Sequence, residues 1–339
     1  MKLDCSGYKA AEAHLASALR SLRRRILVPD VGETKLEKRG FWLKNAASTE
    51  LLETVGEYFL AGYAHAVESR TVAEAEERLE EIPARFRGFA YEGAGMGFAI
   101  LDCLTFGDLR RTTAFLQGRG HHHNYMVYVG IGWAMARLPR FLWPKATLLD
   151  PLLLWLVHDG YGFHQAYFHT DKYVRGQHRE PRFSWPPGQE EYAAHALDQG
   201  IGRALWFVAG TSAERAVTLV ERFPESRRAD LYSGIGLAAT YAGGADDAEL
   251  RWLRERAGPY QGPLAQGSVF AAEARIRAGL LFPHTESAVG VFCGTTAEQA
   301  AEVSRATRPT ATAQDRPPAY EGWRRRIAET FVFHGGVPS

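Results

Sequence analysis

The stretch Tyr91-Glu92-Gly93-Ala94-Gly95 decides the fold, because near copies of it recur along the chain. Without a gap, the pattern returns at Tyr128-Val129-Gly130-Ile131-Gly132 and at Tyr232-Ser233-Gly234-Ile235-Gly236. Successive copies lie 30 to 40 residues apart, which is the length of a two-helix repeat unit. The first glycines of the copies are Gly93, Gly130, Gly160, Gly200, Gly234 and Gly267, and Tyr320-Glu321-Gly322 resembles a truncated seventh copy.

Between the glycine segments lie polar, amphipathic stretches with helical spacing, such as Val72 to Ile82 and Ala213 to Phe223. Pro83 and Pro224 follow these stretches and end each first helix. One unit is therefore an outer amphipathic helix, a turn and an inner helix with Gly-x-Gly. The sequence predicts an all-α chain of six to seven such hairpins, forming an α/α solenoid or toroid.

Glycine inside a helix costs about 1 kcal/mol relative to alanine, so its repeated use needs an offsetting gain. Close approach of neighbouring helices supplies such a gain. Four residues after the first glycine the side chain is small in five of six copies, and His164 is the exception. A phosphate-binding loop is disfavoured, since no copy shows the full Gly-x-Gly-x-x-Gly after a strand.

We expect two parts: residues 1–45 as an N-terminal helix and extended arm, and residues 46–339 as a single helical-repeat domain. The arm is predicted over Arg25 to Phe41. Before it, Ala11, Leu15, Ala18 and Leu22 give the first helix one apolar face, and Arg20, Arg23, Arg24 and Arg25 make it basic. An anionic partner or membrane surface is one interpretation of these arginines, and a solvated helix end is the favoured one.

Charge and cysteine content exclude several classes of protein. The 40 Lys and Arg balance 39 Asp and Glu, so we expect no nucleic-acid partner. Cys5, Cys103 and Cys293 are isolated, which favours the cytoplasm over an oxidising compartment. The first thirty residues contain Asp4 and Glu12 and lack an apolar segment, so we expect no secretory signal. The most hydrophobic stretch, Leu148 to Val157, is interrupted by Asp150 and Pro151 and is too short to span a bilayer.

Equivalent inner-helix positions form two columns that share a helix face. The residues before the first glycine are Glu92, Val129, Asp159, Gln199, Ser233 and Gln266. The residues three positions after it are Met96, Trp133, Phe163, Arg203, Leu237 and Phe270. Carboxyls and amides beside large apolar groups predict a pocket for an apolar small molecule.

Four residues are candidates for acid and base chemistry. Glu92 and Asp159 are the candidate acids, because a carboxyl among aromatic rings has a raised pKa. The alternative is that each carboxyl pairs with an arginine of a neighbouring unit. His158 and His164 are the candidate bases, with a satisfied core histidine as the alternative. Further substrate-binding candidates are Tyr91, Tyr128, Trp133, Phe163, Gln199, Arg203 and His169.

No motif for a metal, a cofactor or a covalent nucleophile is visible. His158, His164 and His169 do not have the spacing of a helical chelate, and His-Glu-x-x-His, Cys-x-x-Cys and Gly-x-Ser-x-Gly are absent from the sequence. We therefore expect neither metal nor cofactor.

Three segments carry a resemblance to a known family: Phe89 to Met96, Tyr125 to Trp133 and Asp159 to His164. In these segments the chain resembles a bacterial family of unknown function from enediyne polyketide and related gene clusters. The resemblance implies a role in natural-product biosynthesis, and it supplies no catalytic residue.

Two functional hypotheses follow. The first is an enzyme that binds a polyene, polyketide or isoprenoid chain between the inner helices and acts by proton transfer, as a cyclase or isomerase does. The second is a non-catalytic, tetratricopeptide-like scaffold that binds a carrier protein or a partner enzyme.

Overall fold

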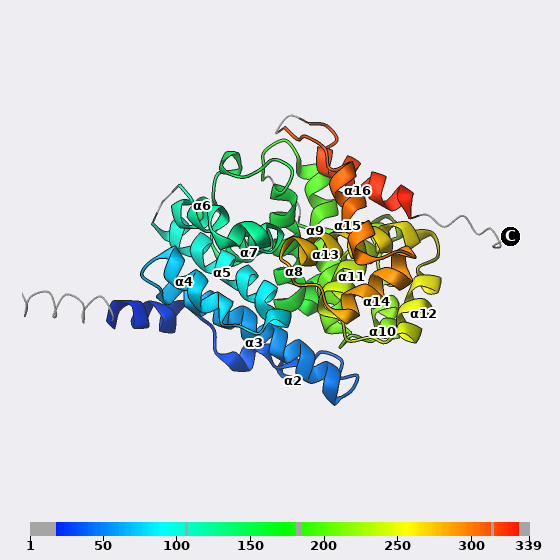
Figure 1. Ribbon diagram of the computed structural model, residues 1–339, viewed down its shortest axis with the longest axis horizontal. Coiled ribbons are helices and arrows are strands. Elements are labelled where there is room, and N and C mark those ends of the chain that lie inside the picture. Colours follow the sequence, from blue (N-terminus) through cyan, green and yellow to red (C-terminus); the bar gives the residue numbers. More distant parts are fainter. Residues whose placement is uncertain (1–17, 106–107, 181–182, 184, 313–314, 332–339) are drawn as a thin grey trace, which may run out of the picture.

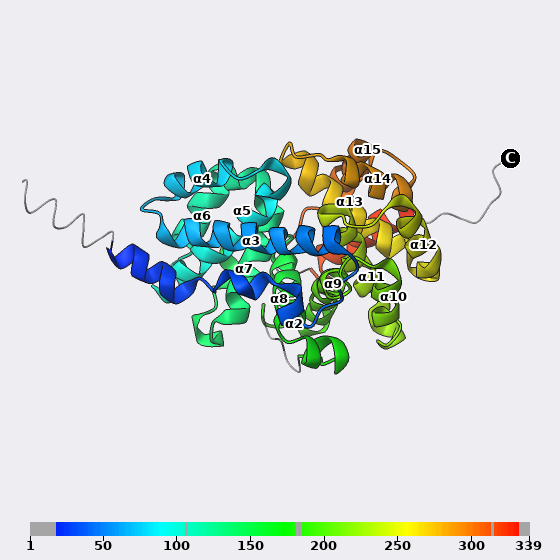
Figure 2. The same ribbon diagram turned by 90° about the horizontal axis from the view of Figure 1, so that it is seen from below.

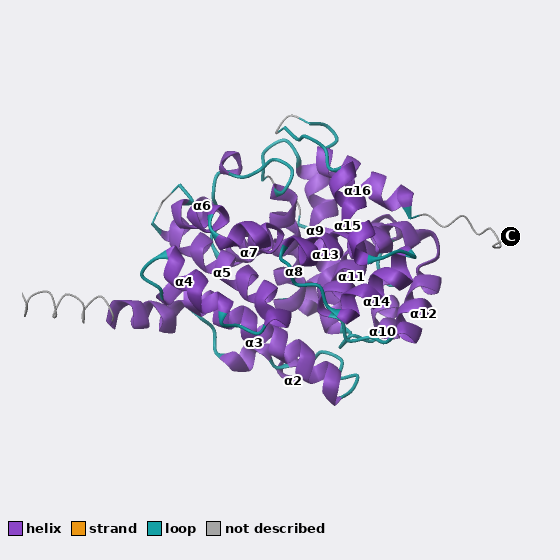
Figure 3. Cartoon of the chain, in the orientation of Figure 1, coloured by secondary structure: helices purple, strands orange, loops and turns teal. Residues whose placement is uncertain are grey.

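A computed structural model of the chain describes residues 18–105, 108–180, 183, 185–312 and 315–331. Within these ranges every regular element is a helix, as Figure 3 shows, so the prediction of an all-α chain is confirmed. After a helix over residues 18–27, the elements are η1 (Val31–Thr34), α2 (Leu36–Arg39), α3 (Ala46–Glu68), α4 (Val72–Glu80), α5 (Ala84–Leu104), α6 (Arg110–Gln117), η2 (Arg119–His123), α7 (Asn124–Arg137), η3 (Arg140–Leu142), η4 (Ala146–Leu148), α8 (Leu154–Phe168), η5 (Asp171–Arg175), α9 (Glu190–Val208), α10 (Ala213–Val220), α11 (Glu225–Ala242), α12 (Asp247–Ala257), η6 (Gly258–Tyr260), α13 (Gln261–Arg277), α14 (Pro283–Cys293), α15 (Ala297–Thr307) and α16 (Ala319–Thr330).

Seven long helices, which we call the central helices, pack against one another in chain order: α3, α5, α7, α8, α9, α11 and α13 (Figure 1). The glycine copies lie on the last six of them. The series also curves back on itself. Arg275 of α13 donates to the Arg85 carbonyl oxygen of α5 at 3.1 Å, and the Phe89 ring of α5 contacts that of Tyr241 in α11. The central helices thus surround a common core.

The two glycines of each copy face different neighbours. A Cβ on Gly200 would lie 1.9 Å from the Asp159 carbonyl oxygen in the preceding helix α8. A Cβ on Gly202 would lie 2.2 Å from the Leu231 carbonyl oxygen in the following helix α11. Two residues on a helix are about 200° apart, so one Gly-x-Gly lets both neighbours approach closely. The interpretation of the glycines as packing devices is therefore confirmed.

The last copy supports the same rule. Gly267 faces Ser233 of the preceding helix α11. The position of the second glycine is occupied by Val269, and α13 is the last of the central helices. The second glycine is lost where there is no following central helix to approach.

Two connections differ from the expected hairpin, although the prolines in Arg179 to Gly188 predict an irregular insertion in the second. Between α7 and α8 the chain forms only the short 3-10 turns η3 and η4, and between α8 and α9 it forms the π-helical turn η5 and irregular backbone. The expected outer helix is absent from the described residues there. Prolines explain this, because Pro139, Pro144 and Pro151 interrupt the first connection and Pro186 and Pro187 the second.

The prediction of an extended arm over Arg25 to Phe41 is wrong, because this segment forms helical turns. It contains the end of the first helix, η1 and α2. The Asp30 side chain caps η1 by accepting from the Gly32 N–H at 2.8 Å, and Gly40 ends α2 with φ of 66°. Figure 2 shows the arm beside α3. Of the apolar face predicted for the first helix, Ala11 and Leu15 lie outside the described residues.

None of the helices in the described part of the chain is both long enough and apolar enough to cross a bilayer.

Candidate active site

The central helices and the arm enclose a cavity of about 570 Å³. Its walls come from α3, α5, α7, α8 and α9 and from the arm segment 29–34. The column three residues after the first glycine lines it, with Met96, Trp133, Phe163 and Arg203. Leu237 and Phe270 of the same column line a smaller cavity of about 50 Å³, which shares the Arg203 side chain. The predicted column thus faces the interior.

A cluster of aromatic rings forms one part of the larger cavity wall. Trp133 is at the centre of this cluster, with ring centroids 4.4 Å from Phe59 and 5.2 Å from Phe163. His164 meets the Trp133 ring edge-on at 5.3 Å. Phe89, Tyr167, Phe168 and Phe207 complete the aromatic lining. Such a wall fits an apolar or unsaturated ligand.

Three carboxyl groups line this cavity, Asp30 and Glu33 from the arm and Glu92 from α5. Glu92 is the buried one among the central helices, with only 3% of its surface exposed. Burial raises the pKa of Glu92 above its ordinary value of 4.5, the negative charge of Asp159 raises it as well, and the resulting pKa is about 7. The Arg203 guanidinium, whose Nη2 lies 3.7 Å from Oε1 of Glu92, acts in the opposite direction. At neutral pH the group is therefore able both to donate and to accept a proton.

Asp159 is held more tightly than Glu92. Arg203 Nη1 donates to one of its carboxylate oxygens, and Gln199 Nε2 donates to the other at 2.9 Å. Gln199 in turn contacts the hydroxyl of Tyr320 at 3.3 Å. Asp159 lines the smaller cavity and not the larger one. The alternative that an acid pairs with an arginine of a neighbouring unit describes Asp159 well.

Helix periodicity and the glycine contacts explain this placement. Gln199 and Arg203 are four residues apart and share one face of α9. Gly200 lies between them and brings α9 against the backbone of α8 at Asp159. Without a Cβ at this position the two helices come close enough for both side chains to reach the Asp159 carboxylate.

Two buried polar atoms at the cavity have no hydrogen-bond partner among the described residues: Trp133 Nε1 and His164 Nδ1. Trp133 Nε1 faces Glu92 and lowers the pKa of that carboxyl by favouring its charged form. Burial lowers the pKa of His164 to about 3, so its imidazole is neutral at pH 7. Buried polar groups are rarely left unpaired, which makes both atoms candidates for ligand contacts. His169, at the end of α8, also lines the cavity.

Gln199, which binds Asp159, lines neither cavity, and three further predicted site residues lie elsewhere. Tyr91 donates to Glu80 Oε1 at 2.7 Å, and Tyr128 accepts from the Asp150 N–H at 2.9 Å. Both ring nitrogens of His158 face backbone carbonyls, and its ring packs on Trp155. All three precede a first glycine by two positions, which turns them about 100° away from Glu92 and Asp159 on their helices. The structure does not bring them to the cavity.

Several cavity residues were missed. Phe89, Tyr167 and Phe207 continue the lining column by one or two helical turns, so the same helical spacing, followed along each helix, predicts them. Phe59 lies on α3, which precedes the first glycine copy. Because α3 carries no Gly-x-Gly, the column positions that predict cavity residues on the other helices are not defined on it.

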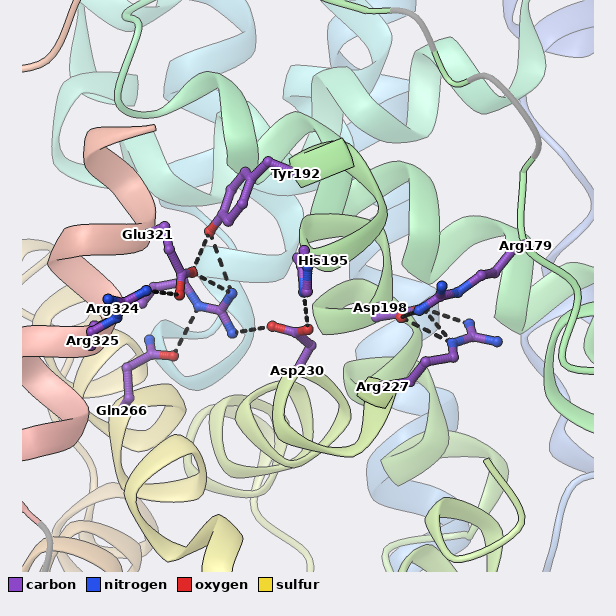
Figure 4. A network of polar contacts seen from close by, with 10 residues as sticks. All are labelled: Arg179, Tyr192, His195, Asp198, Arg227, Asp230, Gln266, Glu321, Arg324 and Arg325. Carbon is purple, nitrogen blue, oxygen red and sulfur yellow. Dashed lines mark hydrogen bonds and ion pairs between the residues drawn. The ribbon is translucent and has the colours of Figure 1, made fainter. Parts of the chain in front are cut away.

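A second polar cluster, shown in Figure 4, joins α16 to α9, α11 and α13. Arg324 of α16 pairs with Asp230 at 2.8 Å and contacts Gln266 at 3.2 Å, and His195 bonds to Asp230 at 2.7 Å. None of these four residues lines the larger cavity. The cluster fixes α16 over the core, where Tyr320 and Trp323 close the smaller cavity.

In the part of the chain that the structure describes, no three His, Cys, Asp or Glu side chains are grouped so that they could hold a metal ion. A family model described as "Protein of unknown function (DUF1702)" matches residues 18–331. No curated protein and no solved structure matches the chain. Any reaction must therefore be argued from the cavity itself.

Proposed function

We propose, for a chain that belongs to the DUF1702 family of proteins of unknown function, that the cavity is the active site of an enzyme. Its substrate is an apolar polyene, polyketide or isoprenoid chain, and its chemistry is proton transfer of the cyclase or isomerase kind. The observation that carries the proposal is Glu92, a buried carboxyl with a pKa of about 7 on the wall of an aromatic cavity.

Glu92 has the properties of a general acid for an alkene. Protonated, it donates its proton to one carbon of a double bond, and the other carbon becomes cationic. The carboxylate that remains then takes a proton from a neighbouring carbon, so the double bond moves or a ring closes and the acid is regenerated. The ring faces of Trp133, Phe163 and Phe59 stabilise the carbocation that exists between the two proton transfers.

The geometry ranks the other candidates. Asp159 holds Arg203 in place, and Arg203 in turn tunes Glu92. His164 is neutral and unpaired at Nδ1, so it serves as a hydrogen-bonding group or a weak base. His158 has both ring nitrogens engaged away from the cavity. Glu92 is therefore the acid, and Asp159 is a positioning residue.

The size and lining of the cavity support the substrate class. About 570 Å³ is within the range of small-molecule sites, and the lining is mostly aromatic and aliphatic. The assignment to natural-product biosynthesis rests on the resemblance carried by the segments at Phe89, Tyr125 and Asp159. In this proposal the hairpin units form an α/α array that curves around the substrate.

A peptide-binding scaffold is less well supported. It would need its column of acids and amides on an open concave surface. Instead Asp159, Gln199, Ser233 and Gln266 are buried. They are also bonded internally, as in the 2.7 Å hydrogen bond from Ser233 Oγ to Gln266 Oε1. The column is therefore not accessible to a partner segment.

The test combines a nearly isosteric variant with a matched control. Glu92→Gln removes the proton donor, and Glu76→Gln changes a buried glutamate that accepts the Arg119 N–H at 2.6 Å, away from the cavity. Ligand binding is measured by titration with parinaric acid, a fluorescent polyene, and activity by product formation in the intact pathway. We expect Glu92→Gln to bind the polyene and form no product, while Glu76→Gln does both.

The contrary result is also defined. Wild-type product from stably folded Glu92→Gln, Asp159→Asn and His164→Ala would refute the catalytic assignment. Failure of the wild-type protein to bind parinaric acid would refute the apolar substrate class.

A further inference from the structure

An arginine-lined pocket lies beneath the helix over residues 18–27, which we call the N-terminal helix. The pocket has a volume of about 300 Å³ and lies between this helix, the ends of α3 and α5 and the starts of α4 and α6. Four arginines line it, Arg23, Arg70, Arg110 and Arg111, and no aspartate or glutamate does. It is separate from the cavity that holds Glu92, with which it shares no lining residue.

Two buried polar atoms in this pocket have no hydrogen-bond partner among the described residues: Arg23 Nε and Ser69 Oγ. Burial and the nearby positive charge of Arg111 lower the pKa of Arg23. Arg70 pairs with Glu74 and Arg111 with Asp102, but within the ranges that the structure describes no ion pair is found for Arg23 or Arg110. The pocket therefore has an excess of positive charge and unused donors, as a site for a phosphate or carboxylate group does.

The N-terminal helix also has an apolar face that points away from the protein. Leu19, Leu22 and Ile26 are 56%, 51% and 70% exposed. With Ala18 they cover about 100° of the helix surface. Arg23 and Arg25 flank this arc on its two sides, and Arg20 and Arg24 lie opposite it. In Figures 1 and 2 the helix projects from the body at the end where α4 and α6 lie.

We propose that the N-terminal helix and the arginine-lined pocket form a docking site for an anionic phospholipid bilayer. The phosphate of a lipid headgroup occupies the pocket, and Leu19, Leu22 and Ile26 enter the boundary between headgroups and acyl chains. A basic helix with one exposed apolar face is the pattern of helices that lie in the membrane interface. The positive charge of the pocket would also suit free phosphate. Free phosphate does not explain the exposed apolar face beside the pocket, whereas a bilayer binds both.

Docking has a consequence for the cavity of Glu92. The N-terminal helix ends two residues before Pro29, and Pro29 and Asp30 line that cavity. A bilayer bound to the helix would lie close to this part of the cavity wall, so an apolar ligand that enters beside Pro29 could pass from the bilayer without crossing water. This consequence rests on the proposed function, whereas the docking itself does not.

The test uses the full chain and flotation with two kinds of vesicle, pure phosphatidylcholine and phosphatidylcholine with phosphatidylglycerol. Arg23→Gln/Arg110→Gln removes pocket charge, and Leu22→Ser/Ile26→Ser removes the apolar face. The matched controls are Arg251→Gln and Phe141→Ser, exposed positions remote from the N-terminal helix in sequence.

We expect the wild type to bind only the anionic vesicles, and more weakly at high salt. The pocket variant should partition about thirty-fold less, which corresponds to about 1 kcal/mol for each arginine. The apolar variant should lose about tenfold or more, and the controls should bind as the wild type does.

Several outcomes would overturn the proposal. One is no wild-type binding to anionic vesicles while millimolar inorganic phosphate protects the protein against thermal unfolding, which would indicate a site for a soluble anion. Another is binding that appears only after deletion of residues 2–17, which would mean that this segment covers the apolar face. A third is a dimer that Leu22→Ser/Ile26→Ser dissociates, which would make a second copy the occupant.

Discussion

The pKa of Glu92 makes a prediction about stability that does not depend on the substrate. The native carboxyl has a pKa of about 7 against an ordinary value of 4.5, because burial penalises its charged form. Between these two values the native protein retains a proton that the unfolded chain has released. The contribution of Glu92 to the free energy of unfolding is therefore fully present below pH 4.5 and is lost as the pH rises through about 7. At roughly 1.4 kcal/mol per pH unit, the loss is about 3 kcal/mol.

Glu92→Gln tests this reasoning, because the amide is neutral throughout this range. The free energy of unfolding of the variant, minus that of the wild type, should rise by about 3 kcal/mol between pH 4.5 and pH 7.5. Urea denaturation across this range measures it. An infrared difference spectrum between the two proteins should show a protonated carboxyl band that titrates near pH 7.

A stability difference that stays constant from pH 4.5 to pH 7.5 would refute the reasoning. So would a protonated carboxyl band that is already lost by pH 5. Either result would mean that Arg203 stabilises the charged form of Glu92 more than burial penalises it.

Three further predictions concern stability alone. Asp159→Asn should destabilise the protein by about 3–5 kcal/mol in urea at pH 7, because it leaves the buried charge of Arg203 without its main partner; an effect below 1 kcal/mol would contradict this. Gly200→Ala should lower the free energy of unfolding by about 2 kcal/mol or more, because its Cβ would lie 1.9 Å from a backbone oxygen. Gly290→Ala is the control: this glycine is in a helix and its Cβ would meet no atom within 4 Å, so the variant should be more stable by about 0.5–1 kcal/mol. Equal effects in urea would refute the packing role of the glycines. His164→Gln should flatten the loss of stability in acid, because the pKa of His164 is about 3 in the native state and the unfolded chain takes up a proton from pH 6.5 downwards. The free energies of unfolding of the variant and the wild type are measured by circular dichroism between pH 6.5 and pH 4. If the two fall in parallel with pH, that expectation is contradicted.

Local periodicity explains why much of the architecture was predictable. Helix formation by Val72 to Glu80 and Ala213 to Val220 follows from apolar spacing, and the ends of these helices follow from prolines. Because the glycines index the helices, they also identified the column of Met96, Trp133 and Phe163 that lines the cavity. Both are properties of a single helix and its spacing.

Other predictions failed where neighbouring residues had to be assigned to faces. Tyr91 and His158 are adjacent to the two acids in sequence, but one residue is about 100° of helix rotation, and each packs in a different environment. The arm was expected to be extended because it contains Ile26, Leu27 and Val28, whereas Asp30 and Gly40 give it helical turns with defined ends.

The sequence by itself determined that the chain is helical, where its close helix contacts occur and which column of side chains faces inward. These follow from interactions within a helix and from the absence of a Cβ at fixed spacing. Only the tertiary structure decided that Glu92 is desolvated on the cavity wall, that Asp159 holds Arg203, and that four arginines meet at the N-terminal helix. Desolvation and charge pairing depend on side chains from several distant helices, and the order of residues along one helix contains no information about them.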